Sequence, residues 1–180
     1  MTEAAADELE GLLPRVEATP PAVTRKDARR RRERPHERRE ELNVLAELAA
    51  LEAGNFWFPA RNDLIEWAMR TEAPACERFL EVGCGTGYVM SGIRTAFPST
   101  ELVGSEIFSA GLEFAAARVP SATFYQMDAR HIPFRDHFDV VGAFDVIEHI
   151  QDDVAVIEEV GRALRPDGRF ILTVPQHPAL

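Results

Sequence analysis

Short apolar segments alternate with longer amphipathic segments over the second half of the chain. The short segments are apolar on both faces, which is typical of parallel strands covered by helices on each side. They predict strands at 78–82, 101–105, 123–126, 138–144 and 169–174, with helices at 87–97, 109–118 and 152–164. The pattern therefore indicates an α/β fold, a Rossmann-like, doubly wound and mostly parallel sheet.

Two amphipathic helices are predicted ahead of this sheet. The first begins near Glu37 and ends at Gly54, with an apolar face formed by Leu42, Leu45, Leu48 and Leu51. The second carries Leu64, Ile65, Trp67 and Ala68 and is closed by Pro74. Residues 1–37 contain few large apolar side chains and are expected to be disordered. The predicted organisation is a charged leader at 1–37, a helical segment at 38–75 and a Rossmann-like domain at 76–180.

Charge is distributed unevenly. Residues 1–41 contain ten acidic and ten basic residues, so the formal net charge of −10 belongs to the rest of the chain. An acidic domain repels phosphate backbones, which argues against nucleic acid as the main substrate. The basic run from Arg25 to Arg39 could contact RNA or an anionic membrane, but acids and a proline interrupt it. A solvated leader is the favoured interpretation.

Cysteine content indicates a reducing compartment, and hydropathy shows whether the chain could span a membrane. Cys76 and Cys84 are the two cysteines of the chain, and their spacing suggests neither a disulfide framework nor a metal site. No segment is apolar for long enough to span a membrane, and the N-terminus lacks the apolar core of a signal peptide. We therefore expect a cytoplasmic protein without a membrane span.

The segment 79–89, Phe-Leu-Glu-Val-Gly-Cys-Gly-Thr-Gly-Tyr-Val, carries the strongest chemical signal. A strand that bends through glycines into a helix N-terminus lets a ligand approach the backbone closely. Gly83, Gly85 and Gly87 therefore predict a cofactor across the carboxyl end of the first strand. Tyr88 excludes both a Walker loop, which needs lysine there, and the dinucleotide fingerprint, which needs glycine there. A tight turn that binds nothing is the alternative.

Acidic residues follow the next two strands. Glu106 could accept hydrogen bonds from both hydroxyls of a ribose, or it could be an ordinary surface acid. Asp128 could accept from an exocyclic amine while the amide of Ala129 donates to a ring nitrogen, and Ile107 could pack against the ring. Asp128 could instead form a turn. These residues predict an adenosine site at the carboxyl edge of the sheet.

The fourth strand ends with Phe144 and Asp145, which we expect beside the reacting centre. Glu148 and His149 follow in the next turn. His149 is the candidate general base, although a structural histidine that holds the loop is the favoured interpretation. Further along, Asp167 and Gly168 predict a left-handed turn into the fifth strand.

Four motifs follow one another along the chain: Glu-Val-Gly-Cys-Gly-Thr-Gly, Gly-Ser-Glu-Ile, Met-Asp-Ala-Arg-His-Ile-Pro-Phe, and Ile-Glu-His-Ile with Leu-Arg-Pro-Asp-Gly. As an ordered set, they resemble the motifs of class I S-adenosylmethionine-dependent methyltransferases. The similarity is to the small-molecule "methyltransferase type 11" group and covers about residues 55–176. It implies that S-adenosyl-L-methionine is the cofactor. The glycine loop would hold the methionine moiety, Glu81 its ammonium group, Glu106 the ribose and Asp128 the adenine. By the same likeness Phe56, Trp57 and Arg61 would close over the cofactor, although core packing explains the aromatic residues equally well.

The resemblance also raises questions about the end of the chain and about the acceptor. The family's sheet continues with two further strands, so the chain is expected to be a C-terminal truncation, or a partner such as a second copy covers the strand-five edge. No Asn/Asp-Pro-Pro-Tyr or Pro-Cys motif follows strand four. The expected reaction is in-line methyl transfer to a small molecule. A nicotinamide-dependent oxidoreductase and a non-catalytic cofactor-binding adaptor are the alternatives.

Overall fold

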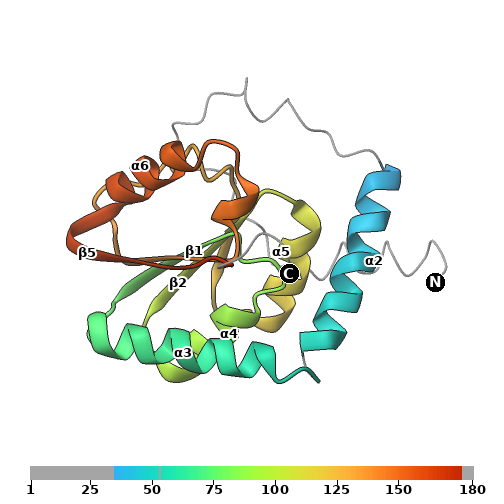
Figure 1. Ribbon diagram of the computed structural model, residues 1–180, viewed down its shortest axis with the longest axis horizontal. Helices are drawn as coiled ribbons and strands as arrows, with labels where there is room; N and C mark the ends of the chain where they lie inside the picture. The colour runs from blue at the N-terminus through green and yellow to red at the C-terminus, as the bar shows by residue number, and fades with distance from the viewer. Residues whose placement is uncertain (1–34, 53, 176–180) are drawn as a thin grey trace.

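The computed structural model describes residues 35–52 and 54–175 (Figure 1). Most of the predicted leader lies outside the described residues. The helix α2 (Pro35–Glu52) begins slightly before its predicted start, and α3 (Trp57–Glu72) follows it. Within the described residues, no helix is both long enough and apolar enough to cross a lipid bilayer.

The sheet confirms the predicted α/β architecture. Its five strands are all parallel and run in the order β3-β2-β1-β4-β5, so the strand order reverses between β1 and β4. The strands are β1 (Arg78–Val82), β2 (Glu101–Glu106), β3 (Thr123–Gln126), β4 (Phe138–Phe144) and β5 (Leu164–Thr173). The connecting helices are α4 (Tyr88–Ala96), α5 (Ser109–Arg118), the short 3₁₀ helix η1 (Ile147–His149) and α6 (Asp153–Ala163).

Two hydrophobic cores lie on the two faces of this sheet. Because successive strand residues point to opposite faces, Phe79 packs into one core and Leu80 into the other. The Phe79 core includes Met69 of α3 and Met90 of α4, whereas the Leu80 core includes Val156 of α6. Figure 1 shows α6 on one side of the sheet and α3 and α4 on the other. Because the strands are parallel, their carboxyl ends lie at a common edge between these two layers.

The packed faces of the first two helices agree with the prediction only in part, since Leu42, Leu45 and Leu48 of α2 are half-buried as expected. In α3 the buried residues are Asn62, Ile65 and Met69, while Leu64 and Trp67 are 56% and 63% exposed. In α2 Leu51 is exposed and Glu52, the last residue of the helix, is buried instead. A helix turns by about 100° per residue. A small rotation of the docked helix about its axis therefore changes which of two neighbouring residues is buried. The sequence pattern alone did not specify this rotation.

The fifth strand begins at Leu164 rather than at Arg169. Leu164 pairs with Phe138, and Arg169 pairs with Val140, so the intervening segment bulges out of the ladder. Asp167, within this bulge, has a φ of 65°. The predicted left-handed turn is therefore confirmed, and it is built into the strand rather than placed before it.

Gly142 in the middle of β4 gives a prediction about stability. A β-carbon there would lie 2.7 Å from Cε2 of Phe144 and 2.9 Å from Cζ of Phe79. We expect Gly142→Ala to lower the free energy of unfolding by about 1–3 kcal/mol, measured by urea denaturation, because the surrounding core must shift. Gly161→Ala is the control, because Gly161 lies on an exposed face of α6 with nothing within 4 Å of an added β-carbon. Equal losses in both variants would contradict the prediction.

Candidate functional site

The predicted site residues gather at the carboxyl edge of the sheet. The loop after β1, the end of β2 and the end of β4 meet there because these three strands are adjacent and parallel. The strand order reverses between β1 and β4, and ligands of open α/β sheets bind in the crevice at such a reversal. The structure thus assembles Glu81, Gly85, Glu106 and Asp145 from segments far apart in the sequence.

The three glycines of the loop have different physical roles. Gly83, Gly85 and Gly87 have φ values of 70°, 49° and 74°, a region that favours glycine. A β-carbon on Gly83 would lie 2.5 Å from Cγ2 of Val146, and one on Gly87 would lie 2.9 Å from Cα of Ala115. A β-carbon on Gly85 would meet nothing within 4 Å. Gly83 and Gly87 therefore allow close packing within the protein, and Gly85 borders open space that a ligand could fill.

Glu81 lies in the last part of β1 and is 3% exposed. Its Oε2 is buried and has no hydrogen-bond partner. Burial raises the pKa of Glu81 well above its usual value, the nearby charge of Glu106 raises it further, and Arg61 opposes the shift. A buried carboxylate oxygen without a donor is costly, so a cation bound beside it would be strongly favoured. This unpaired oxygen fits the ammonium group of S-adenosylmethionine.

Glu106 connects the glycine loop to the end of β2. Its Oε2 accepts a hydrogen bond from the N–H of Gly85 (3.2 Å). Its Oε1 accepts from the N–H groups of Ile107 (2.7 Å) and Phe108 (3.2 Å). Ile107 is exposed beside it, as a residue that packs against a ligand ring would be. The carboxylate is thus oriented by three backbone amides, and Oε2 has capacity for a further donor.

Asp128 is engaged by a residue that the sequence interpretation did not consider. Arg130 donates through Nε to Oδ1 (3.0 Å) and through Nη2 to Oδ2 (2.6 Å), and its backbone N–H also donates to Oδ1 (3.0 Å). These hydrogen bonds lower the pKa of Asp128. Ala129 is buried between the two. The Asp-x-Arg spacing was the available signal that this carboxylate forms a bidentate ion pair.

Asp145 is held by two residues from distant segments. Its Oδ2 accepts from Nη1 of Arg61 in α3 (2.7 Å), and its Oδ1 accepts from Oγ1 of Thr173 in β5 (3.0 Å). Asp145 itself has a φ of 57°. Phe144, the residue before it, is buried in the core. Nε of Arg61 is buried without a partner, so the arginine retains one free donor at this edge.

The aromatic residues at the start of α3 do not pack in the core. Phe56 is 84% exposed and Trp57 is also exposed, so core packing, the alternative explanation for them, is wrong. Phe58 packs edge-on against Tyr88, with ring centroids 5.7 Å apart. The guanidinium of Arg61 lies 5.5 Å from the centroid of the Phe58 ring. Phe58 and Tyr88 therefore join the start of α3 to the start of α4.

His149 ends the 3₁₀ helix η1, and its side chain is 78% exposed. Its Nε2 lies 4.0 Å from Oε1 of Glu148, too far for a hydrogen bond. This arrangement does not favour a structural imidazole that holds the loop. Among the described residues, no group of three or more His, Cys, Asp or Glu side chains is arranged to hold a metal ion.

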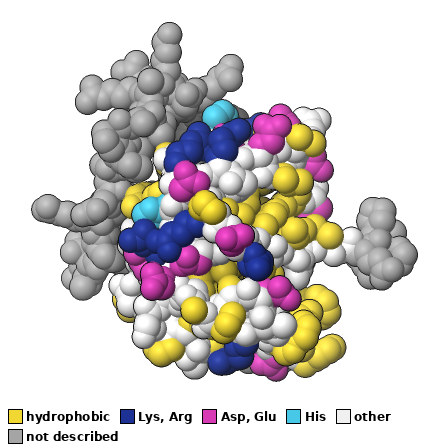
Figure 2. Space-filling view, turned by 90° about the vertical axis from the view of Figure 1, so that its left-hand side faces the viewer, with side chains coloured by type: hydrophobic (Ala, Val, Ile, Leu, Met, Phe, Trp, Pro, Cys, Tyr) yellow, Lys and Arg dark blue, Asp and Glu magenta, His cyan; other side chains and the backbone are white. Residues whose placement is uncertain are grey.

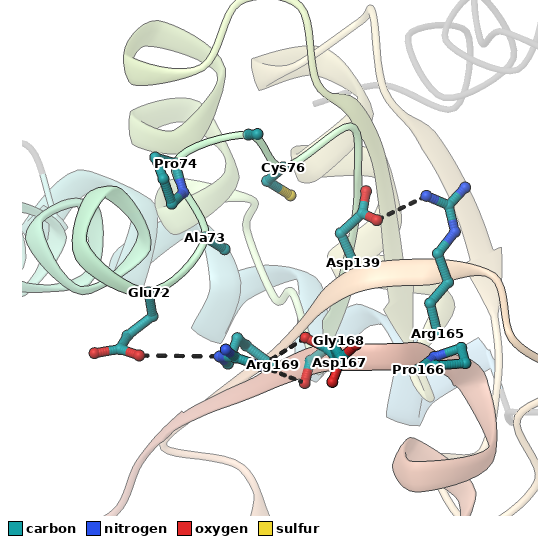
Figure 3. Close-up of a pocket in the computed structure, with 11 residues that line it drawn as sticks. Glu72, Ala73, Pro74, Cys76, Asp139, Arg165, Pro166, Asp167, Gly168 and Arg169 are labelled. Atoms are coloured by element: carbon teal, nitrogen blue, oxygen red, sulfur yellow. Dashed lines mark hydrogen bonds and ion pairs between the residues drawn. The ribbon is translucent and has the colours of Figure 1, made fainter.

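A hollow of about 220 Å³ lies at the opposite, amino edge of the sheet (Figure 3). Arg165 donates to Oδ1 of Asp139 (2.7 Å), and Arg169 lies 3.9 Å from Glu72, so charges of opposite sign pair across it. Burial, as the main cause, raises the pKa of the Cys76 thiol in its wall to about 12, so that thiol is inert. Figure 2 shows that acidic and basic side chains interleave on this face. The hollow is therefore a gap between the β5 bulge and the end of α3 that these ion pairs span, and we assign no ligand to it.

Comparison with known proteins agrees with this geometry. A family model described as "Methyltransferase domain" matches residues 80–172. A probable S-adenosylmethionine-dependent methyltransferase of Mycolicibacterium smegmatis is 30% identical over 67% of this chain and 46% of its own length. The 27-O-demethylrifamycin SV methyltransferase of Amycolatopsis mediterranei is 36% identical over 54% of this chain and 38% of its own. This chain therefore spans about half the length of these relatives or less.

Solved structures are also similar. An amino pentose methyltransferase from Micromonospora echinaspora, solved with bound S-adenosylmethionine, is 26% identical, with a TM-score of 0.64 over 74% of this chain and 57% of that one. Streptomyces venezuelae DesVI, 24% identical with a TM-score of 0.63 over 76% of this chain and 58% of its own, shares the fold. The parallel sheet, the glycine bend, the Oε2 of Glu81 without a donor and the family match lead to one conclusion. The chain belongs to the methyltransferase-domain family of class I S-adenosylmethionine-dependent methyltransferases.

Proposed function

We propose that this protein transfers the methyl group of S-adenosylmethionine to a small-molecule acceptor. The observation that carries the proposal is the buried, unpaired Oε2 of Glu81 in the strand that leads to the open space at Gly85. The cofactor supplies an electrophilic methyl carbon on a sulfonium. The residues of the chain bind and orient it.

The methionine end of the cofactor would lie between two buried charges of opposite sign. Oε2 of Glu81 would accept from the ammonium group, and Nε of Arg61 would donate to the carboxylate, since both atoms are buried without partners. The pairing of Arg61 with Asp145 supports this role, because the carboxylate of Asp145 holds the guanidinium at the edge of the sheet. Binding the cofactor would thus relieve two costly desolvated groups at once.

The adenosine end would lie along the ends of β2 and β3. Glu106 would accept from the ribose hydroxyls, and the exposed side chain of Ile107 would pack against the ring. Asp128 is paired with Arg130, so an adenine amine would compete with that guanidinium or share the carboxylate with it. The amide of Ala129 would donate to the ring as the sequence predicted. Phe56 and Trp57, both exposed at the start of α3, would cover the bound cofactor.

Most of the rate acceleration would come from alignment of the acceptor and exclusion of water. Relatives named for a rifamycin and an amino pentose support a small metabolite as acceptor. His149 as general base stays a prediction, and its exposure would let it meet an acceptor arriving from solvent. A cytoplasmic location and self-association through β5, where Leu172 is exposed, also stay predictions. Tyr88, where a dinucleotide site needs glycine, argues against a nicotinamide cofactor.

Calorimetric titration tests the proposal. S-adenosylhomocysteine, the demethylated product, is expected to bind and NAD is not. Glu106→Ala is expected to abolish this binding, because it removes the ribose acceptor and frees the N–H of Gly85. Glu101→Ala is the matched control, because Glu101 lies at the opposite end of the same strand in a surface pair with Arg78. Normal binding by Glu106→Ala would show that the ribose assignment is wrong, and binding of NAD alone would overturn the proposal.

A further inference from the structure

Glu52 is a charged residue in an unusual position. It is the last residue of α2 and is 3% exposed, whereas every other side chain described in that helix, from Leu42 to Leu51, is exposed or half-buried. A buried carboxylate is retained at low cost only when it is paired and hydrogen-bonded. The attachment of α2 to the rest of the protein therefore depends strongly on what Glu52 contacts.

Both oxygens of Glu52 contact the glycine loop or its support. Oε1 accepts from the hydroxyl of Thr86 (2.5 Å), and Oε2 accepts from Nη1 of Arg118 in α5 (2.7 Å). The same Nη1 of Arg118 donates to the carbonyl oxygen of Thr86 (3.0 Å) and to its Oγ1 (2.8 Å). The guanidinium also lies 5.2 Å from the centroid of the Tyr88 ring. Glu52, Thr86 and Arg118 thus form one closed polar cluster.

Thr86 lies between Gly85 and Gly87, which have φ values of 49° and 74°. A glycine on each side of Thr86 would otherwise leave this segment free to adopt many conformations. The cluster fixes Thr86 through its hydroxyl and its carbonyl, and so it fixes the backbone on both sides of it. The conformation of Gly85, which borders the open space, is therefore set partly by a residue at the end of α2.

We infer that Glu52 is a positioning residue, which couples the docking of α2 to the shape of the cofactor loop. The inference rests on the proposed function, in which the cofactor binds beside Gly85. If Glu52 is neutralised, Arg118 loses its buried counter-ion and Thr86 loses an acceptor, so the loop and α2 both loosen. By linkage, cofactor binding to the ordered loop must strengthen the docking of α2 by the same factor.

The experiment uses Glu52→Gln, Thr86→Val and the double variant of the full chain, with Glu47→Gln, an exposed position of the same helix, as the control. Each single change is expected to weaken S-adenosylhomocysteine binding about tenfold in calorimetry. The double variant is expected to bind S-adenosylhomocysteine with about the affinity of the single variant that binds it less tightly, because each substitution already disrupts the same cluster. Hydrogen exchange of residues 42–52 is the second measurement. The ligand should increase amide protection there in the wild type and in Glu47→Gln but not in Glu52→Gln.

The outcomes separate this inference from the proposed function. If the wild type does not bind S-adenosylhomocysteine, the proposed function fails first. If the wild type binds and Glu52→Gln binds equally well, or if the ligand leaves the protection of α2 unchanged in the wild type, the coupling is wrong while the function stands. If Glu52→Gln fails to fold, the coupling is tested by the affinity of Thr86→Val, which removes no charge, and by hydrogen exchange of the wild type with and without ligand.

Discussion

Replacing Gly85 by valine is expected to weaken binding of S-adenosylhomocysteine at least about 100-fold, which corresponds to about 2.7 kcal/mol, while the protein stays folded. The added side chain would project into the space that borders Gly85, where nothing lies within 4 Å of a β-carbon. The φ of 49° disfavours any side chain by about 1–2 kcal/mol, so the loop would also be strained. Calorimetry measures the affinity, and thermal unfolding by circular dichroism measures the fold.

Gly161→Val is the matched control for this prediction. Gly161 also has open space around an added β-carbon, but it lies in α6 and its φ is not positive. We expect this control to bind as the wild type does. Wild-type affinity in Gly85→Val would mean that the cofactor does not approach the loop at this position, and the proposed site would have to be abandoned.

Glu81→Gln is expected to weaken cofactor binding by about 100-fold or more while making the free protein more stable at neutral pH. The affinity falls because the amide cannot neutralise the ammonium group of the cofactor. The stability rises because the buried carboxyl of Glu81, whose Oε2 has no donor, is costly to ionise. A site residue that destabilises the free protein is typical of functional sites.

The stability gained by Glu81→Gln is expected to grow as the pH rises. The pKa of Glu81 in the folded protein is raised well above 4.5, mainly by burial. The stabilising contribution of the protonated group is therefore complete below pH 4.5 and is lost as the pH rises through the folded-state pKa. Melting curves at several pH values should show the variant gaining on the wild type as the pH increases, with Glu101→Gln as control. Cofactor affinity of the wild type should rise with pH over the same window. If the difference in stability between the variant and the wild type does not change with pH, Glu81 does not have the raised pKa that burial implies.

Most of the fold could be predicted from local pattern. The glycine bend, the prolines that end helices and the short apolar segments specify β1 to β4 and α4 to α6, because each element depends mainly on its own residues. The start of β5 was predicted too late. Its first residues join the sheet by pairing Leu164 with Phe138 across a bulge, and such pairing depends on a strand elsewhere in the chain. Leu51 of α2 and Leu64 and Trp67 of α3 were wrongly placed on the packed faces for a similar reason, since docking sets the rotation of each helix.

The sequence predicted the positions of the site residues, but it did not predict which of their side chains already have ion-pair or hydrogen-bond partners. Sequence reasoning placed Glu81, Glu106, Asp128 and Asp145 at strand ends, and the structure brings them to one edge. Sequence reasoning overlooked the Asp-x-Arg spacing that pairs Asp128 with Arg130, and it could not tell that Arg61, 84 residues away, holds Asp145. Glu52 was not considered at all, because nothing local marks a helix-end acid as buried.

By itself, the sequence determined the order of the elements, the glycine bend after the first strand and the ordered motifs of a methyltransferase, since these follow from backbone preferences and short-range spacing. Tertiary structure alone decided which charges are paired and which buried oxygen is left without a donor. The physical reason is that desolvation and ion pairing depend on groups brought together from distant parts of the chain. The pKa of Glu81 is raised because the fold buries it among distant segments, whereas the pKa of Asp128 is lowered by Arg130, a neighbour within its own segment.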